Sequence, residues 1–454
     1  MPDQRPSIRI ACASGFSGDR TDGAAPVVAE LAAGGGGTLI FETLAERTLA
    51  LAQLSRDADP ERGYEPLLDD LVSPVLGDCL AHDISIVSNF GAANPPAAAR
   101  RIAAIASEQN LPAPRIAIVT GDALNNPEQR EMLHAQVGID VAPEAIVSAT
   151  AYLGAREIAE ALTQGAQVVV AGRVADPALT VGPAMAHFGW SWNDWPRLGR
   201  ATMAGHMLEC GTQVTGGYFA VPGLKDVPDL DRTGFPIVTL DADGGFEIGK
   251  PAGTGGRVDC AIAKEQLLYE VHDPAAYLTP DVIADISQAR IEQVGVDRVR
   301  VAGISGHARP DTLKVNICYR GGWLAEAEIS YAGHQAESRA RLAGEIVQRR
   351  IGAALKLRID LVGSLSVFGD DAGRMAASHH ASEARDIRLR VAAAHEDRHV
   401  AERVLREVTA LYCCGPAGGG GVRTSIRQRL NMVSTTIDRA AVRCAWHFLD
   451  EAHA

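Results

Sequence analysis

The sequence predicts an α/β protein, in which an N-terminal, doubly wound and mostly parallel sheet is followed by a C-terminal α+β domain. The uncharged apolar run Val168–Ala171 has the composition of a strand that is buried on both faces. Strand patterns alternate with helical patterns as far as His187, as expected of βαβ units. After Pro236 this alternation gives way to hairpin patterns. We therefore expect two domains, at residues 1–215 and 216–454.

The first domain is expected to alternate strands and helices along the chain. The strands are predicted at residues 8–13, 38–41, 83–88, 115–120 and 168–171. Apolar residues with helical spacing predict helices at residues 24–33, 44–55, 64–80, 97–109, 151–163 and 177–187. Pro177 suits the first turn of the last helix, because its missing N–H needs no partner there. Residues 123–137 are predicted to be a surface excursion.

The second domain is predicted to have a different order of strands and helices. A hairpin is predicted at residues 237–248, around an Asp-Gly-Gly turn. Further strands are predicted at residues 288–303, 312–319, 323–331, 359–368 and 387–392, with helices at 335–354 and 396–409. The apolar run Ala440–Phe448 is interpreted as a late core strand or as a docking surface.

Composition excludes several classes of protein. The net charge of −13 removes the overall attraction that drives binding to nucleic acid. No segment is long and apolar enough for a membrane helix, and the N-terminus lacks the apolar region of a signal peptide. The eight cysteines show no paired C-x-x-C spacing, so no zinc site is expected. We expect a cytoplasmic protein that binds neither nucleic acid nor membranes, and no metal ligands are assigned.

Polar residues follow each predicted strand of the first domain. Because the carboxyl ends of parallel strands meet at one edge of a sheet, these residues predict a single ligand site there. They are Gly15, Gly18, Asp19 and Arg20, then Glu42 and Arg47, then Asn89 and Asn94, then Asp122, and finally Arg173 and Asp176. The glycines would let a nucleotide or another anionic group approach the backbone, although the G-x-G-x-x-G spacing is not met. The alternatives are an exposed ion pair at Glu42 and Arg47 and structural turns at the two asparagines.

Three later segments add candidates. His206 and Glu209 share a helix face, which suits an acid–base pair, a ligand pair or a structural histidine. Lys250 precedes a glycine loop that could cradle a phosphate or a carboxylate. The loop with Gly418, Gly419 and Arg423 could bind an anion through its backbone N–H groups or act as a hinge, and the neighbouring Cys414 is a nucleophile or a buried thiol.

Several motifs together resemble one known family. They are Gly15–Arg20, Glu42–Thr48, Ser88–Pro95, Gly172–Pro177, Gly205–Gly211, Lys250–Gly256, Gln266–Glu270, His272–Pro274 and Gly415–Gly421. On these motifs the chain resembles the acyclic terpene utilisation AtuA family, formerly a domain of unknown function. The resemblance implies a place in the degradation of citronellol and geraniol as CoA thioesters. Longer relatives resemble this chain followed by a small ferredoxin-like domain, which implies such a domain as a separate partner protein.

The functional hypothesis is an enzyme that acts by proton transfer on a small carboxylic acid or its CoA thioester, as a hydratase, lyase or isomerase. The candidate acids and bases are Asp176, Glu42, Asp122, His206 and Glu209. Arg20, Arg47 and Arg173 would hold the small anionic substrate. The alternatives are a hydrolase of the same substrates, or a non-catalytic acyl-CoA-binding or assembly subunit of a carboxylase pathway. The sequence requires no cofactor, and we expect a homo-oligomer.

Overall fold

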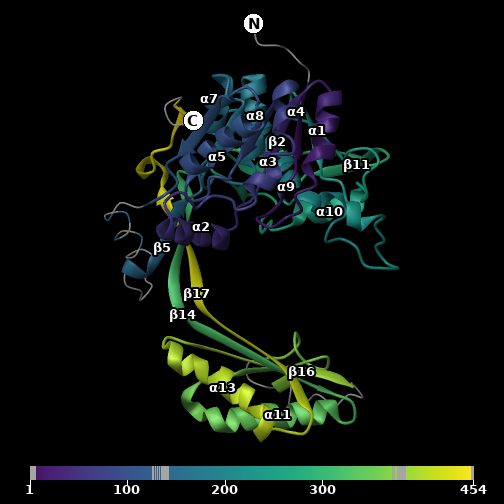
Figure 1. Cartoon of the computed structure of the whole chain (residues 1–454). Helices are drawn as coiled ribbons and strands as arrows, with labels where there is room; N and C mark the ends of the chain where they lie inside the picture. Colours follow the sequence, from purple (N-terminus) through teal and green to yellow (C-terminus); the bar gives the residue numbers. More distant parts are fainter. Residues whose placement is uncertain are drawn as a thin grey trace. The chain divides into compact units, whose positions relative to one another are not determined.

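The computed structural model describes residues 7–124, 143–370 and 385–450, with isolated positions in the two gaps between these ranges. The chain divides into two compact units (Figure 1). Unit 1 contains Met1–Cys318 and Met432–Ala454, and unit 2 contains Tyr319–Asn431. The boundary expected at residue 215 therefore falls within unit 1. The predicted surface excursion lies largely outside the described residues.

The centre of unit 1 is a parallel sheet. Its strands are β1 (Ser7–Cys12), β2 (Gly37–Phe41), β3 (Ile84–Ser88), β6 (Val168–Ala171) and β4 (Ile116–Thr120), in that spatial order. All neighbouring pairs among these five are parallel. Each residue of β6 is buried, so the prediction of a fully buried central strand from its apolar run is confirmed.

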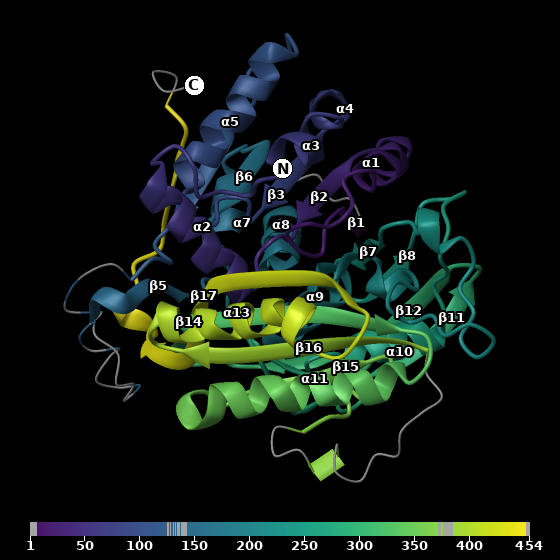
Figure 2. The ribbon, with the colours of Figure 1, turned by 60° about the horizontal axis from the view of Figure 1, so that its bottom comes forward.

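Antiparallel strands extend both edges of this centre. On the β1 side lie β7 (Ile237–Asp241), β8 (Phe246–Gly249), β12 (Arg298–Ala302) and β11 (Arg290–Gly295), and β18 (Ala445–Phe448) pairs with β4. Figure 2 shows this sequence of strands from β6 to β11. The sheet is therefore mixed, and the predicted parallel arrangement holds only for its centre. The hairpin predicted at residues 237–248 as part of a second domain instead pairs with the free edge of β1 through β7, and β12 pairs with its other strand, β8. The sequence pattern alone does not reveal these pairings.

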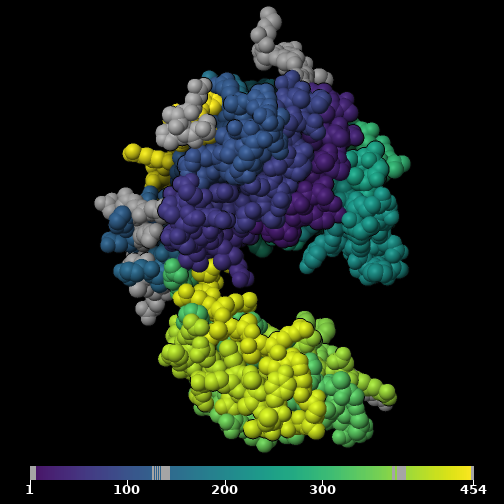
Figure 3. Space-filling view, viewed as in Figure 1, coloured from purple at the N-terminus to yellow at the C-terminus, as the bar shows by residue number. Residues whose placement is uncertain are grey.

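Helices cover both faces of the sheet, because alternate residues of the central strands belong to two different apolar cores. One face carries α1 (Ala24–Ala33), α3 (Leu68–Val72), α4 (Leu76–Ala81) and α5 (Pro95–Glu108). The other carries α7 (Arg156–Thr163), α8 (Ala178–Phe188) and α9 (Trp195–Glu209). Elements α1 to α5 form much of the surface of unit 1 that faces the viewer in Figure 3, in purple to blue.

Several shorter elements complete unit 1. They are α2 (Glu46–Ala58), β5 (Ile146–Ala151), α10 (Cys260–Leu268), β9 (Tyr277–Leu278), β10 (Ile283–Asp285) and β13 (Ser305–His307). Short 3₁₀ helices of unit 1 lie at Pro143–Ala145, Gly211–Thr215, Leu230–Arg232 and Arg439–Ala441, and one of unit 2 lies at Gly352–Ala354. Within the described ranges, no helix is long and apolar enough to cross a membrane.

Unit 2 has the element order β-α-β-β-α-β. The elements are β14 (Thr312–Ala332), α11 (Ala336–Ile351), β15 (Arg358–Val362), β16 (Asp386–His395), α13 (Arg398–Cys414) and β17 (Gly419–Asp438). The strands lie side by side in the order β15-β16-β14-β17, and both helices pack on one core. This is the arrangement of a ferredoxin-like unit. The sequence prediction looked for such a unit only in a separate partner.

Candidate functional site

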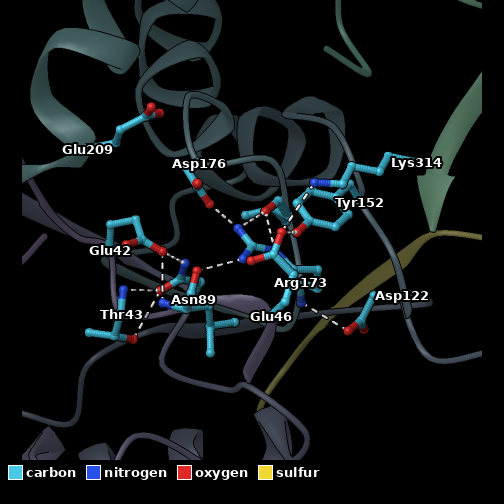
Figure 4. A network of polar contacts seen from close by, with 12 residues as sticks. Glu42, Thr43, Glu46, Asn89, Asp122, Tyr152, Arg173, Asp176, Glu209 and Lys314 are labelled. Atoms are coloured by element: carbon cyan, nitrogen blue, oxygen red, sulfur yellow. Dashed lines mark hydrogen bonds and ion pairs between the residues drawn. The ribbon is translucent and has the colours of Figure 1, made fainter. Parts of the chain in front are cut away.

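The central parallel strands bring four chain segments together at their carboxyl ends. Glu42 follows β2, Asn89 follows β3, Asp122 follows β4, and Arg173 and Asp176 follow β6. Figure 4 shows these side chains around Arg173. Hydrogen bonds join Glu42 to Asn89 and Asp122 to Arg173, and an ion pair joins Arg173 to Asp176. The strand-end position thus explains why residues far apart in the sequence meet.

Arg173 is the centre of this network, and it is almost completely buried. Its guanidinium donates hydrogen bonds to the carbonyl oxygens of Leu44 (2.7 Å) and Val174 (2.8 Å), and it forms an ion pair with Asp176. Its backbone N–H donates to Oδ2 of Asp122 at 2.9 Å. The guanidinium also lies 4.6 Å from the centre of the Tyr152 ring. Arg173 therefore holds the strand-end loops together and neutralises Asp176.

Glu42 is held by hydrogen bonds rather than by an ion pair. Its Oε1 accepts from the backbone N–H of Leu44 at 2.7 Å and from Nδ2 of Asn89 at 2.8 Å. Oδ1 of Asn89 in turn accepts from the backbone N–H of Thr43 at 2.9 Å. Burial and the negative charge of Asp176 raise the pKa of Glu42 well above its ordinary value. Glu42 is therefore a buried carboxyl group with a raised pKa next to Asp176.

Asp176 and Asp122 lie on different sides of Arg173. Burial raises the pKa of Asp176, and the charge of Arg173 opposes this shift. The Asp176 side chain is 33% exposed, so this carboxylate can be reached from solvent. Asp122 is 5% exposed, and burial raises its pKa to about 6. Gly172 permits this arrangement, because a Cβ there would lie 2.7 Å from a carboxylate oxygen of Asp122.

Glu209 and His206 form a buried pair at the end of α9. Nδ1 of His206 lies 2.8 Å from Oε1 of Glu209, and Nε2 lies 3.0 Å from the carbonyl oxygen of Gln266. Both ring nitrogens thus face oxygen atoms, so a proton is shared between this ring and Glu209. Burial raises the pKa of Glu209 to about 7, opposed by His206, and the charge of Asp176 raises it further. Oε2 of Glu209 is buried and has no hydrogen-bond partner among the described residues.

Four residues of this site were missed by the sequence prediction. The Tyr152 hydroxyl donates to Oε1 of Glu46 at 2.8 Å, and Nζ of Lys314 lies 3.2 Å from the same oxygen. Nζ of Lys314 also lies 4.6 Å from the centre of the Tyr152 ring. The Tyr277 ring lies 5.2 Å from the His206 ring, and burial followed by the charges of Glu209 and Asp176 raises its pKa. Glu46 lies in the Glu42–Thr48 motif but was not assigned to the site, whereas Tyr152, Lys314 and Tyr277 belong to none of the motifs.

The residues after β1 hold the local structure instead. Gly15 packs so closely that a Cβ would lie 2.5 Å from the carbonyl carbon of Cys210, and its N–H donates to Oδ2 of Asp19 at 2.9 Å. Arg20 donates to the carbonyl oxygens of Thr233 (2.7 Å) and Asp231 (3.0 Å). These contacts give the predicted ligand-binding residues Gly15, Asp19 and Arg20 a structural role.

The remaining residues that the sequence predicted to bind a ligand make no contact with Arg173 among the contacts described above. Asn94 donates to the carbonyl oxygens of Pro60 and Arg62, so it fixes a loop. Lys250 is bonded to the Thr254 carbonyl at 2.9 Å and lies 3.2 Å from Asp297. Gly18 has a φ of 98°, which its turn requires, and Arg47 is exposed on α2. Gly418, Gly419 and Arg423 belong to unit 2, where the loop packs against Tyr331. Among the described residues, no three His, Cys, Asp or Glu side chains are arranged to hold a metal ion.

The fold and this site define a mixed α/β protein with a carboxyl-rich site at the ends of its central parallel strands. The family model described as "Acyclic terpene utilisation family protein AtuA" matches residues 8–448, nearly the whole chain. The chain belongs to this family, as its motifs predicted, and membership indicates a role in acyclic terpene utilisation. No curated protein and no solved structure shows significant similarity to the chain.

Proposed function

We propose that the chain is an enzyme that transfers a proton to or from a small carboxylic acid or its CoA thioester, in a hydratase, lyase or isomerase reaction. The observation that supports this most is Glu209, a buried carboxyl group whose pKa is about 7 and whose Oε2 has no partner among the described residues. A general acid or base works best when its pKa lies near the working pH. A buried structural carboxyl group would be expected to have both oxygens bonded.

The neighbours of Glu209 suit this role. His206 fixes Oε1 of Glu209, which leaves Oε2 as the atom that exchanges a proton with the substrate. Asp176 is partly exposed and supplies a second carboxyl group, whose charged form is favoured by Arg173 although burial raises its pKa. Carboxyl groups whose environments separate their pKa values can serve as acid and base in one reaction. His206 is thus a positioning residue, and Glu209 and Asp176 carry the proton transfer.

Lys314 provides the positive charge for an anionic substrate. Its side chain is 50% exposed, and its charge acts on the partly exposed Asp176. An anionic group of the substrate, or the oxyanion that forms when a proton leaves the carbon next to a carbonyl, would be stabilised by this ammonium group. Arg173 cannot take the same role, because its guanidinium is already bonded to Leu44, Val174 and Asp176.

The experiment is deuterium exchange in D₂O. We expect the wild-type protein to incorporate deuterium at the carbon next to the carbonyl of butyryl-CoA or citronellyl-CoA, as detected by mass spectrometry. Glu209→Gln keeps the shape of the side chain but replaces the ionisable carboxyl group with an amide, which cannot act as a general acid or base. We expect this variant to slow deuterium exchange about 100-fold or more. Glu265→Gln is the matched control, because Glu265 lies half-exposed on α10 in an ion pair with Lys225.

The same assay separates the alternatives. Release of free CoA without exchange would favour a hydrolase. Binding of the thioesters without exchange or release would favour the acyl-CoA-binding subunit. Equal exchange rates in the wild type and Glu209→Gln would refute the role of Glu209.

A further inference from the structure

A cavity of about 210 Å³ lies at the carboxyl ends of β3 and β4, beside α2. Its apolar wall includes Leu49, Ala92 and Pro95. Asp122 lines this cavity, whereas Glu42, Asp176 and Glu209 are not among its described lining residues. Arg173 contacts Asp122 through its backbone N–H and Asp176 through its guanidinium, so it connects a lining residue of the cavity to the carboxyl cluster (Figure 4). The cavity is thus a separate space next to the proposed proton-transfer site.

Three buried polar side chains line this cavity, namely Asp122, Ser148 and Thr150. Thr150 is 5% exposed, and its hydroxyl has no hydrogen-bond partner within the described part of the chain. A buried polar atom without a partner costs free energy unless a ligand or water satisfies it. Asp122 is also 5% exposed and accepts a hydrogen bond from the Arg173 backbone, which leaves lone pairs for a further donor. The Ser148 hydroxyl likewise has no partner within the described part of the chain, so the cavity presents two hydroxyl groups and a carboxyl group to its occupant.

Arg56 supplies the positive charge of the cavity. One of its NH groups donates to the carbonyl oxygen of Ala93 at 2.6 Å. The other guanidinium N–H groups have no hydrogen-bond or ion-pair partner in the ranges that the structure describes. An arginine with free N–H groups binds carboxylates, often with two parallel hydrogen bonds. An anionic group of a ligand would thus bind Arg56 and avoid Asp122, whose charge repels it.

We propose that this cavity binds a short-chain hydroxy carboxylic acid, with its carboxylate on Arg56 and its hydroxyl group between Asp122 and Thr150. The volume of the cavity fits such an acid. An engineered cavity of about 150 Å³ takes up benzene, so a cavity of 210 Å³ has room for a ligand of about seven to nine non-hydrogen atoms. The apolar wall contacts the carbon chain, and the ligand hydroxyl donates to Asp122 and accepts from Thr150. This binding is independent of the proton transfer at Glu209 and is measured without it.

The test compares 3-hydroxybutyrate with butyrate, by calorimetry on the full chain. We expect wild-type protein to bind 3-hydroxybutyrate about 10-fold more tightly than butyrate, the effect of one well-formed hydrogen bond. Thr150→Val keeps the side-chain shape and should abolish this preference. Arg56→Gln should weaken the binding of both acids to a similar extent. Arg62→Gln is the control, because Arg62 is an exposed arginine of the neighbouring loop that does not line the cavity.

Each variant is first compared with the wild type by thermal unfolding, so that lost binding is not mistaken for lost folding. The proposal is overturned if neither acid binds at millimolar concentration, or if both acids bind equally well to the wild type. It is also overturned if Thr150→Val leaves the preference unchanged, or if Arg62→Gln weakens binding as much as Arg56→Gln. Failure of deuterium exchange at Glu209 would leave these binding results unaffected.

Discussion

Arg173→Met should destabilise unit 1 strongly. Methionine fills much of the same space, but it removes the donors to the carbonyl oxygens of Leu44 and Val174 and the partner of Asp176. The sequence alone suggested an arginine that binds the substrate. Its burial and its bonds to the backbone instead predict that the fold depends on it.

The size of the effect follows from the buried charges. Removing one partner of a buried ion pair costs about 3–5 kcal/mol, because the other charge is left uncompensated. The carboxyl groups of Glu42 and Asp176 can escape part of this cost by taking up protons, since their pKa values are already raised. Without Arg173 the pKa of Asp176 rises further. A carboxyl group with a raised pKa in the folded state destabilises the fold as pH increases, so the loss should be larger at about pH 8 than at about pH 5.

The assay is urea unfolding followed by tryptophan fluorescence, which reports mainly on unit 1, since Trp190, Trp192, Trp195 and Trp446 lie there. Arg62→Met is the control, because the Arg62 side chain is 70% exposed and its ion pair with Asp59 is long, at 3.8 Å. An exposed pair of this kind contributes less than about 1 kcal/mol. A loss for Arg173→Met below about 1 kcal/mol at pH 8, or a loss that grows as the pH falls, would refute the reasoning.

Three further predictions concern single groups. Asp122→Asn keeps an acceptor for the Arg173 N–H and should stabilise the fold by about 3 kcal/mol above pH 7, because the wild-type carboxyl group has a pKa of about 6 instead of 3.8. Urea unfolding should show that this gain in the free energy of unfolding vanishes below about pH 4. A gain that is independent of pH would contradict the prediction. Gly15→Ala should lower the free energy of unfolding by about 1–3 kcal/mol, because the new Cβ forces the Cys210 backbone away. Gly295→Ala is the control and should have no such effect, since a Cβ there meets its neighbours at ordinary contact distances. Equal thermal midpoints for the two variants would show that the backbone near Gly15 adjusts without cost. The wild-type exchange rate should rise with pH through about 7 as Glu209 ionises, and a flat profile there would exclude Glu209 as the base.

The sequence predicted the part of the site that depends on strand geometry. Glu42, Asn89, Asp122, Arg173 and Asp176 meet because each directly follows a central parallel strand, and parallel strands end at one edge. The position of a residue after a strand does not determine which way its side chain points. Arg173 points inward to backbone carbonyl oxygens, a direction that no spacing in the sequence encodes.

The rest of the site depends on contacts between distant segments. Tyr152 precedes α7 and Lys314 lies on β14, and they meet at Glu46 only in the folded chain. The division into units was missed for a similar reason, because the hairpin of β7 and β8 pairs with β1 although its pattern is that of a separate antiparallel domain. The homo-oligomer and the ferredoxin-like partner stay predictions.

Gly15 shows how a residue can serve the site without touching a ligand. The glycine turn after β1 first suggested a backbone that approaches an anion. In the structure the close approach is to Cys210, the residue that follows Glu209 at the end of α9. Gly211 lies equally close, with a Cβ position 3.2 Å from the Gly15 nitrogen. The turn therefore fixes the end of the helix that carries His206 and Glu209, and through it the direction of the unpartnered Oε2. Glycine is needed there because any side chain would displace this helix end, and the Glu209 carboxyl group with it.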